Sequence, residues 1–131
     1  MKYLCTIYGE ESGWSDATPE QVSEVMAAYG AFGEEAGQAG VILGGEGLEP
    51  TSAATTVRVR EGERVLSDGP FAETKEQLGG FYLLECDSLD EAIDWAAKIP
   101  GASTGSVEVR PVMNYEGAGS EDAQRSAAAQ S

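Results

Sequence analysis

The stretch between residues 67 and 81 contains charged side chains that are candidates for a chemical role. Asp68, Glu73 and Lys75 place two carboxylates and an ammonium group within eight residues, and Arg110 adds a cation that stays charged at any physiological pH. Such a set could transfer protons or bind a polar ligand. Charged side chains on a loop are more often solvated or loosely paired. We therefore keep these residues as candidates for catalysis or binding beside a purely structural interpretation.

The same stretch contains a turn, Asp68-Gly69-Pro70-Phe71. The aspartate can bond nearby backbone N–H groups, the proline restricts the glycine before it, and the phenylalanine can anchor the loop on an apolar surface. As a ligand-binding site, the turn would present these four residues together with Arg110. A turn alone also accounts for these residue types.

Histidine is absent from the chain, and the two cysteines, Cys5 and Cys86, form neither a metal-binding spacing nor a Cys-x-x-Cys pair. The chain therefore lacks the commonest metal ligand and proton shuttle. We expect no metal site, no cofactor and no catalytic triad. We expect reduced, buried thiols, close to one another if their strands are neighbours.

The 131 residues include 8 basic and 23 acidic side chains, a net charge of −15. Such a charge repels phosphate backbones and anionic membrane surfaces, which argues against nucleic-acid and membrane partners. The N-terminal MKYLCTIY is too short and too interrupted for a signal peptide, and no stretch approaches the ~20 apolar residues that span a bilayer. We expect one cytoplasmic domain, with enough of its 41% hydrophobic residues to form a core.

Five segments are predicted to be strands, and two of them, residues 2–8 and 80–86, are apolar on both faces. The others are residues 41–43, 55–60 and 106–112. A turn at Gly62 continues the strand at 55–60 into a hairpin that we expect to extend the sheet. The glycine-rich run that follows residue 43 lacks the Lys-Ser/Thr ending of a phosphate loop, so we interpret it as a turn.

Two helices are predicted. The first begins at a capping box, Thr18-Pro19-Glu20-Gln21, and ends at Gly40. Its apolar stripe comprises Val22, Val25, Met26, Tyr29, Phe32 and Ala36. Three glycines inside it, Gly30, Gly33 and Gly37, each cost about 1 kcal/mol relative to alanine, so we expect the sheet to approach the helix backbone there. The second helix begins at Ser88 and ends at residues 100–101.

The order of these elements predicts an α+β fold, a ferredoxin-like β-α-β-β-α-β arrangement with an inserted hairpin strand and loop. Both helices would cover one face of an antiparallel sheet and leave apolar side chains on the other face. A homodimer that buries sheet against sheet would shield them. Four aromatic residues could line a pocket or pack in the core or dimer interface: Tyr8, Trp14, Phe81 and Tyr82.

The C-terminal residues are rich in Gly, Ser, Ala and Gln, with no large apolar side chain after Tyr115. Such a segment cannot offset its ordering entropy by burial. We therefore predict a domain over residues 1–113 and a disordered tail over 114–131.

The stretch from residue 67 to residue 81 closely resembles the DGPF motif of the YCII-related family. The resemblance covers about residues 1–113 and also includes the initial MKYL, the run Gly44-Gly45-Glu46-Gly47-Leu48 and the run Val107-Glu108-Val109-Arg110-Pro111. It implies a ferredoxin-like, dimeric α/β-barrel fold, with a cleft beside each sheet where related barrels handle small organic molecules. In other branches of the group a histidine and an aspartate are suspected of catalysis, but this chain has no histidine to match.

The sequence and its resemblance to this family lead us to expect one of two functions. The first is a protein that binds or converts a small organic molecule in a cleft of the dimeric barrel. The second is a regulatory interaction protein, because some family members are thought to accompany extracytoplasmic-function sigma factors and the −15 charge could meet a basic surface. We favour the first, since the sequence presents no clear partner-binding helix or peptide groove.

Overall fold

A computed structural model of the chain describes residues 1–114, so the predicted tail lies outside the described residues apart from Asn114. The elements follow one another in this order: β1 (Lys2–Gly9), α1 (Ser12–Ser15), α2 (Pro19–Gln38), β2 (Ile42–Gly47), the 3-10 helix η1 (Thr51–Ala53), β3 (Thr55–Arg60), β4 (Glu63–Asp68), β5 (Gln77–Glu85), α3 (Leu89–Ala97), α4 (Gly101–Thr104) and β6 (Ser106–Pro111).

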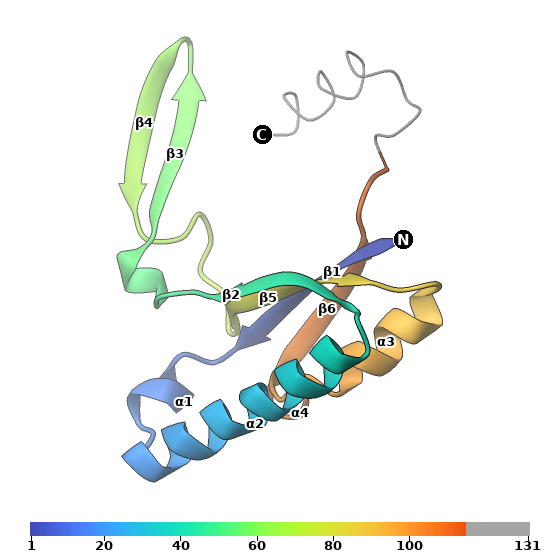
Figure 1. Cartoon of the computed structure of the whole chain (residues 1–131). Coiled ribbons are helices and arrows are strands. Elements are labelled where there is room, and N and C mark those ends of the chain that lie inside the picture. Colours follow the sequence, from blue (N-terminus) through green and yellow to red (C-terminus); the bar gives the residue numbers. More distant parts are fainter. Residues whose placement is uncertain (115–131) are drawn as a thin grey trace.

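Four strands form one antiparallel sheet in the order β2-β5-β1-β6. The two strands that are apolar on both faces, β1 and β5, lie side by side at its centre. Figure 1 shows α2, α3 and α4 on one side of this sheet. The architecture is α+β and is consistent with a ferredoxin-like fold.

The β3–β4 hairpin is a separate two-stranded sheet, so the expectation that it extends the main sheet is wrong. Pro50 and η1 redirect the chain after β2, which takes β3 away from the edge of the sheet. Its turn is a tight one, with positive φ at Glu61 (51°) and Gly62 (81°). In Figure 1 the hairpin projects from one end of the sheet, on the side opposite the helices.

The core lies between the sheet and the helices. Its buried residues are Tyr3, Cys5, Phe32, Ala36, Val41, Leu84, Cys86, Ala92, Ala96 and Ile99. The Phe32 ring of α2 packs against Tyr82 of β5 and Trp95 of α3, with centroid separations of 5.0 and 6.4 Å. This aromatic cluster joins the long helix both to the sheet and to the second helix.

The start of α2 has the predicted capping box. The Thr18 hydroxyl accepts a hydrogen bond from the backbone N–H of Gln21, and the Gln21 side chain accepts one from the Thr18 N–H. The predicted apolar stripe is only partly buried, because Met26 remains 62% exposed.

The glycines inside α2 are not there because of a close neighbour. A Cβ atom built on Gly30, Gly33 or Gly37 would meet nothing within 4 Å. The expected approach of the sheet to this part of the helix is therefore wrong.

The glycine-rich run after Leu43 is strand β2 and not a turn. A Cβ atom on Gly45 would lie 2.7 Å from the Phe81 carbonyl oxygen and 2.7 Å from the Tyr82 ring. Glycine is used here because it lets an edge strand approach β5 closely. The sequence therefore predicted only the start of this strand, at residues 41–43, since glycine has no side chain to alternate.

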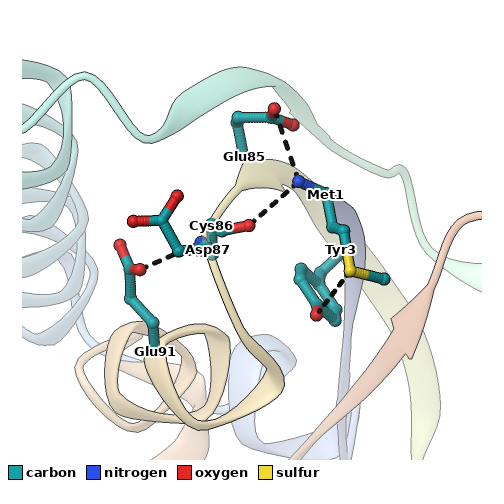
Figure 2. A network of polar contacts seen from close by, with 6 residues as sticks. All are labelled: Met1, Tyr3, Glu85, Cys86, Asp87 and Glu91. Carbon is teal, nitrogen blue, oxygen red and sulfur yellow. Dashed lines mark hydrogen bonds and ion pairs between the residues drawn. The ribbon is translucent and has the colours of Figure 1, made fainter.

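A polar network fixes the end of β5 and the start of α3 to the beginning of β1 (Figure 2). The Met1 amino group donates to the carbonyl oxygen of Cys86 at 3.0 Å and lies 3.5 Å from the Glu85 carboxylate. On the other side, Glu91 accepts from the Asp87 backbone N–H at 3.0 Å and donates its own N–H to the Ser88 hydroxyl at 3.2 Å. The predicted cap at Ser88 is thus confirmed.

Candidate functional site

The second face of the four-stranded sheet, on the side away from α2, α3 and α4, carries an apolar surface that we call the open face. The strand register assigns to it side chains of β1 and β5: Leu4, Thr6, Tyr8, Leu78, Phe81 and Leu83. None of these packs against the buried core, and all except Leu78 are half-buried. The alternation of side chains along a strand explains the arrangement, because Tyr3 and Cys5 between them point into the core.

Thr6 lies at the centre of the open face, opposite Phe81 of β5 on one side and Glu108 of β6 on the other. Its hydroxyl oxygen is buried and has no hydrogen-bond partner among the described residues. A buried polar group without a partner is destabilising by about 1–3 kcal/mol and is rare in native proteins. A bound ligand or an ordered water on this face would supply the missing bond.

The edges of the open face are charged. On β6, Arg110 lies opposite Leu4 and forms a 2.7 Å ion pair with Glu108. On the other edge, Glu46 of β2 lies opposite Phe81. A molecule lying on the apolar centre would therefore meet charged groups at its rim.

The Asp68-Gly69-Pro70-Phe71 segment lies at the base of the hairpin. Asp68 is the last residue of β4, opposite Thr55. Gly69 has φ 88°, a conformation that favours glycine, and its N–H donates to the Ala54 carbonyl at 2.7 Å. Phe71 is 80% exposed, so the expectation that it anchors the loop is wrong. Backbone hydrogen bonds hold the turn instead.

The remainder of this loop, up to residue 76, is tied to the ends of β1 and β6. Lys75 lies 4.0 Å from Glu10, and Glu76 accepts a hydrogen bond from the Ser106 hydroxyl at 2.8 Å. These contacts are exposed, so each stabilises the loop only slightly.

Glu11 is a structural link that the sequence analysis missed. Its carboxylate accepts hydrogen bonds from the Thr51 backbone N–H at 2.7 Å and from the Thr51 hydroxyl at 2.8 Å. Its own N–H donates to the Gln77 side chain at 2.9 Å. One residue thereby joins the end of β1 to η1 and to the start of β5, which no local pattern could reveal.

The predicted catalytic and binding residues are not brought into one cluster. Within residues 1–114 no ion pair joins Asp68, Glu73, Lys75 and Arg110 to one another. Arg110 belongs to the open face, four residues along β6 from the serine that meets the loop. Their roles in binding or catalysis stay predictions.

The four aromatic candidates separate into two groups. Tyr8 and Phe81 lie on the open face, whereas Tyr82 packs on Phe32 in the core and Trp14, on α1, is 53% exposed. Burial, together with the neighbouring Tyr29, raises the pKa of Tyr82. Tyr8 and Phe81 are therefore the aromatic pair that a ligand on the sheet could contact.

The two cysteines are buried free thiols. The ladder places Cys5 opposite Tyr82, while the backbone of Cys86 bonds to Met1 beyond the end of the paired strands. Burial, with a smaller contribution from Cys86, raises the pKa of Cys5 to about 11. Cys5 is thus a protonated packing residue at neutral pH and a poor nucleophile.

Within residues 1–114, no three acidic or cysteine side chains are arranged to hold a metal ion. None of the helices in that part is long and apolar enough to cross a membrane.

A solved structure with a similar fold is that of the 5-chloro-2-hydroxyhydroquinone dehydrochlorinase TftG from Burkholderia phenoliruptrix AC1100, in complex with 2,5-dihydroxybenzoquinone. The TM-score is 0.50 with 16% identity, and the match covers 87% of this chain and 95% of that one. At 16% sequence identity, this comparison shows a similarity of fold alone.

Sequence comparison gives a closer relationship. An uncharacterized protein of Rhizobium meliloti (strain 1021), R00369, is 46% identical over 121 residues, which is 88% of this chain and 95% of that protein. The model of the YCII-related domain matches residues 1–116. The resemblance seen in the sequence is thereby confirmed, and this chain belongs to the YCII-related family.

Proposed function

We propose that this protein binds or converts a small organic molecule on the open face of its sheet, in the cleft of a dimeric α/β barrel. The observation that carries the proposal is the buried Thr6 hydroxyl without a hydrogen-bond partner, set in an apolar surface with charged edges. Ligand sites are mostly apolar with a few polar groups that orient the ligand. The open face has that composition.

The surface favours a flat ring with polar substituents. A ring can stack on Phe81, because aromatic faces gain energy from offset contact. A hydroxyl or carbonyl substituent would then be near Thr6, and an acidic substituent could replace Glu108 as the partner of Arg110. The dehydrochlorinase of similar fold was solved with a ligand of this class, a dihydroxybenzoquinone, which supports the choice.

A second copy would complete the cleft. A single copy leaves the apolar open face in contact with water, which folded monomers rarely do over a large area. A twofold dimer would cover the same surface on both copies at once. The sigma-factor partner and the cytoplasmic location expected from the sequence stay predictions.

Binding is tested by thermal shift with a panel of hydroxylated benzenes and quinones that includes 2,5-dihydroxybenzoquinone. A ligand at 100 times its dissociation constant stabilises the native state by about 2.7 kcal/mol. We expect at least one panel member to raise the melting temperature of the wild type. Thr6→Val keeps the shape and removes the hydroxyl, so affinity should fall about tenfold, which corresponds to about 1.4 kcal/mol.

The matched control is Asp68→Asn at the base of the hairpin, which should leave the affinity unchanged. If Asp68→Asn abolishes the shift while Thr6→Val retains it, the ligand binds the loop and not the sheet. A panel without any stabilising compound would remove the support for this class of ligand.

A further inference from the structure

The β3–β4 hairpin presents an apolar surface that nothing in residues 1–114 covers. Pairing places Val57 opposite Leu66 and Val59 opposite Arg64, so these four side chains share one face of the hairpin. Val57, Val59 and Leu66 are 57%, 59% and 62% exposed. Three large apolar side chains on one face of a projecting hairpin (Figure 1) indicate a surface that packs against something.

The stability of the hairpin leads to the same expectation. A two-stranded hairpin alone in water is at best marginally stable, and it needs a further strand or a packing surface. The hydrogen bonds at its base, from the Gly69 N–H to the Ala54 carbonyl and from the Thr56 hydroxyl to the Gly69 carbonyl, fix only where it begins. The six-residue strands beyond them lack such support from the main sheet.

One arginine of the hairpin, Arg64, lies on its apolar face and can meet an acidic group of another copy. Residues 55–68 contain Arg58, Arg60 and Arg64, three of the seven basic residues in residues 1–114, and are neutral overall. The remainder of residues 1–114 has four basic and seventeen acidic side chains, a net charge of −13. Arg64, which shares the face of Val57, Val59 and Leu66, can therefore pair with a carboxylate of another copy of the same acidic chain.

The length of the hairpin also matches the width of the four-stranded sheet. A strand of six residues is about 20 Å long, and four paired strands span about 15 Å from first to last. The hairpin can therefore cross the whole open face of a second copy. Its tip would then reach an edge of that sheet, where a carboxylate stands on either side: Glu46 on β2 or Glu108 on β6.

We propose that the β3–β4 hairpin is a dimerisation arm that lies across the open face of a second copy of this chain. Val57, Val59 and Leu66 of the arm cover the apolar centre of that face, and Arg64 pairs with a carboxylate at its edge. The inference rests on the proposed ligand cleft and deepens it. Each cleft has a floor from one copy and a cover from the other, and is incomplete in a single copy.

The first test compares two aspartate variants on opposite faces of the same hairpin. The wild-type protein should have a mass of about 27 kDa by light scattering, twice the 13.7 kDa of one chain. Val57→Asp should weaken the dimer at least tenfold. Val65→Asp places the same charge in the paired strand on the other face, so the dimer should persist.

The possible outcomes of this test distinguish a failure of the proposed arm from a failure of the proposed dimer. A wild type of 13.7 kDa at all concentrations would contradict the dimer itself. A dimeric wild type with equal effects of Val57→Asp and Val65→Asp would overturn the arm and leave the ligand cleft to its own test.

A second test does not depend on the folding of a charged variant. Chains with Leu66→Cys are mixed with chains with Leu83→Cys and oxidised, and the native Cys5 and Cys86 are buried. We expect a disulfide-linked heterodimer in the mixture. The matched mixture of Val65→Cys with Leu83→Cys should give little of the disulfide-linked heterodimer. Equal cross-linking in the two mixtures would overturn the proposal.

Discussion

Replacing Gly105 by alanine is expected to lower the free energy of unfolding by about 3 kcal/mol. Gly105 comes just before β6, and a Cβ atom there would lie 2.1 Å from the Tyr8 carbonyl oxygen and 3.1 Å from the Gly9 Cα atom. Both atoms belong to the backbone of β1, so no side-chain rotation can relieve the contact. The alanine variant must move β6 away from β1 beside Tyr8, and urea denaturation measures the loss.

Gly30→Ala is the matched control for this substitution. A Cβ atom at position 30 meets nothing within 4 Å, and alanine is favoured over glycine in a helix interior by about 1 kcal/mol. The same chemical change should therefore stabilise the protein at residue 30 and destabilise it at residue 105. An equal effect at the two positions would show that β1 and β6 are not as close as described.

Two adjacent leucines of β5 are expected to respond in opposite ways to substitution. Leu84 is fully buried under the helices, and Leu84→Ala should lower the unfolding free energy by about 3 kcal/mol, because it removes buried methyl groups and leaves a cavity. The proposed dimer should persist, since this side chain points away from the open face. Chemical denaturation and light scattering measure the two properties.

Leu83 lies on the open face, opposite Leu4. Leu83→Asp should leave the folded secondary structure intact by circular dichroism and should reduce the mass from about 27 kDa to 13.7 kDa. A charge buried in a dimer interface without a partner is strongly unfavourable, but on a monomer it stays in water. If Leu83→Asp unfolds the chain as Leu84→Ala does, both faces of β5 are core and the open face does not exist.

The main sheet and its helices could be predicted because their signals are local. The capping box at Thr18 and the cap at Ser88 depend on side chains three residues apart. The strands β1 and β5 were recognised by apolar residues on both faces, and the ferredoxin-like order of elements implies that they are adjacent in the sheet. The spacing of apolar residues and the capping residues therefore identify such elements without knowledge of any tertiary contact.

The wrong predictions concern features that depend on contacts between distant parts of the chain. Only the beginning of β2, predicted at residues 41–43, could be recognised, because the glycines that let the strand approach Tyr82 erase its alternation. The hairpin was predicted correctly as a hairpin, but its separation from the sheet depends on the direction that η1 gives the chain. The roles of the charged loop residues stay predictions, and the unsatisfied hydroxyl of Thr6 is a further candidate that was not singled out from the sequence. A threonine inside an otherwise apolar strand face was the only sequence signal for it.

The most direct test of the open face as the ligand site is a methyl spectrum of leucine-labelled protein with and without 2,5-dihydroxybenzoquinone, or the best compound of the panel. The chain has eight leucines, of which Leu4, Leu78 and Leu83 lie on the open face and Leu84 lies in the core. We predict ligand-dependent shifts at the three open-face leucines, with Leu84 nearly unchanged. Shifts confined to leucines away from this face, with Leu4 and Leu83 unmoved at saturation, would contradict the account.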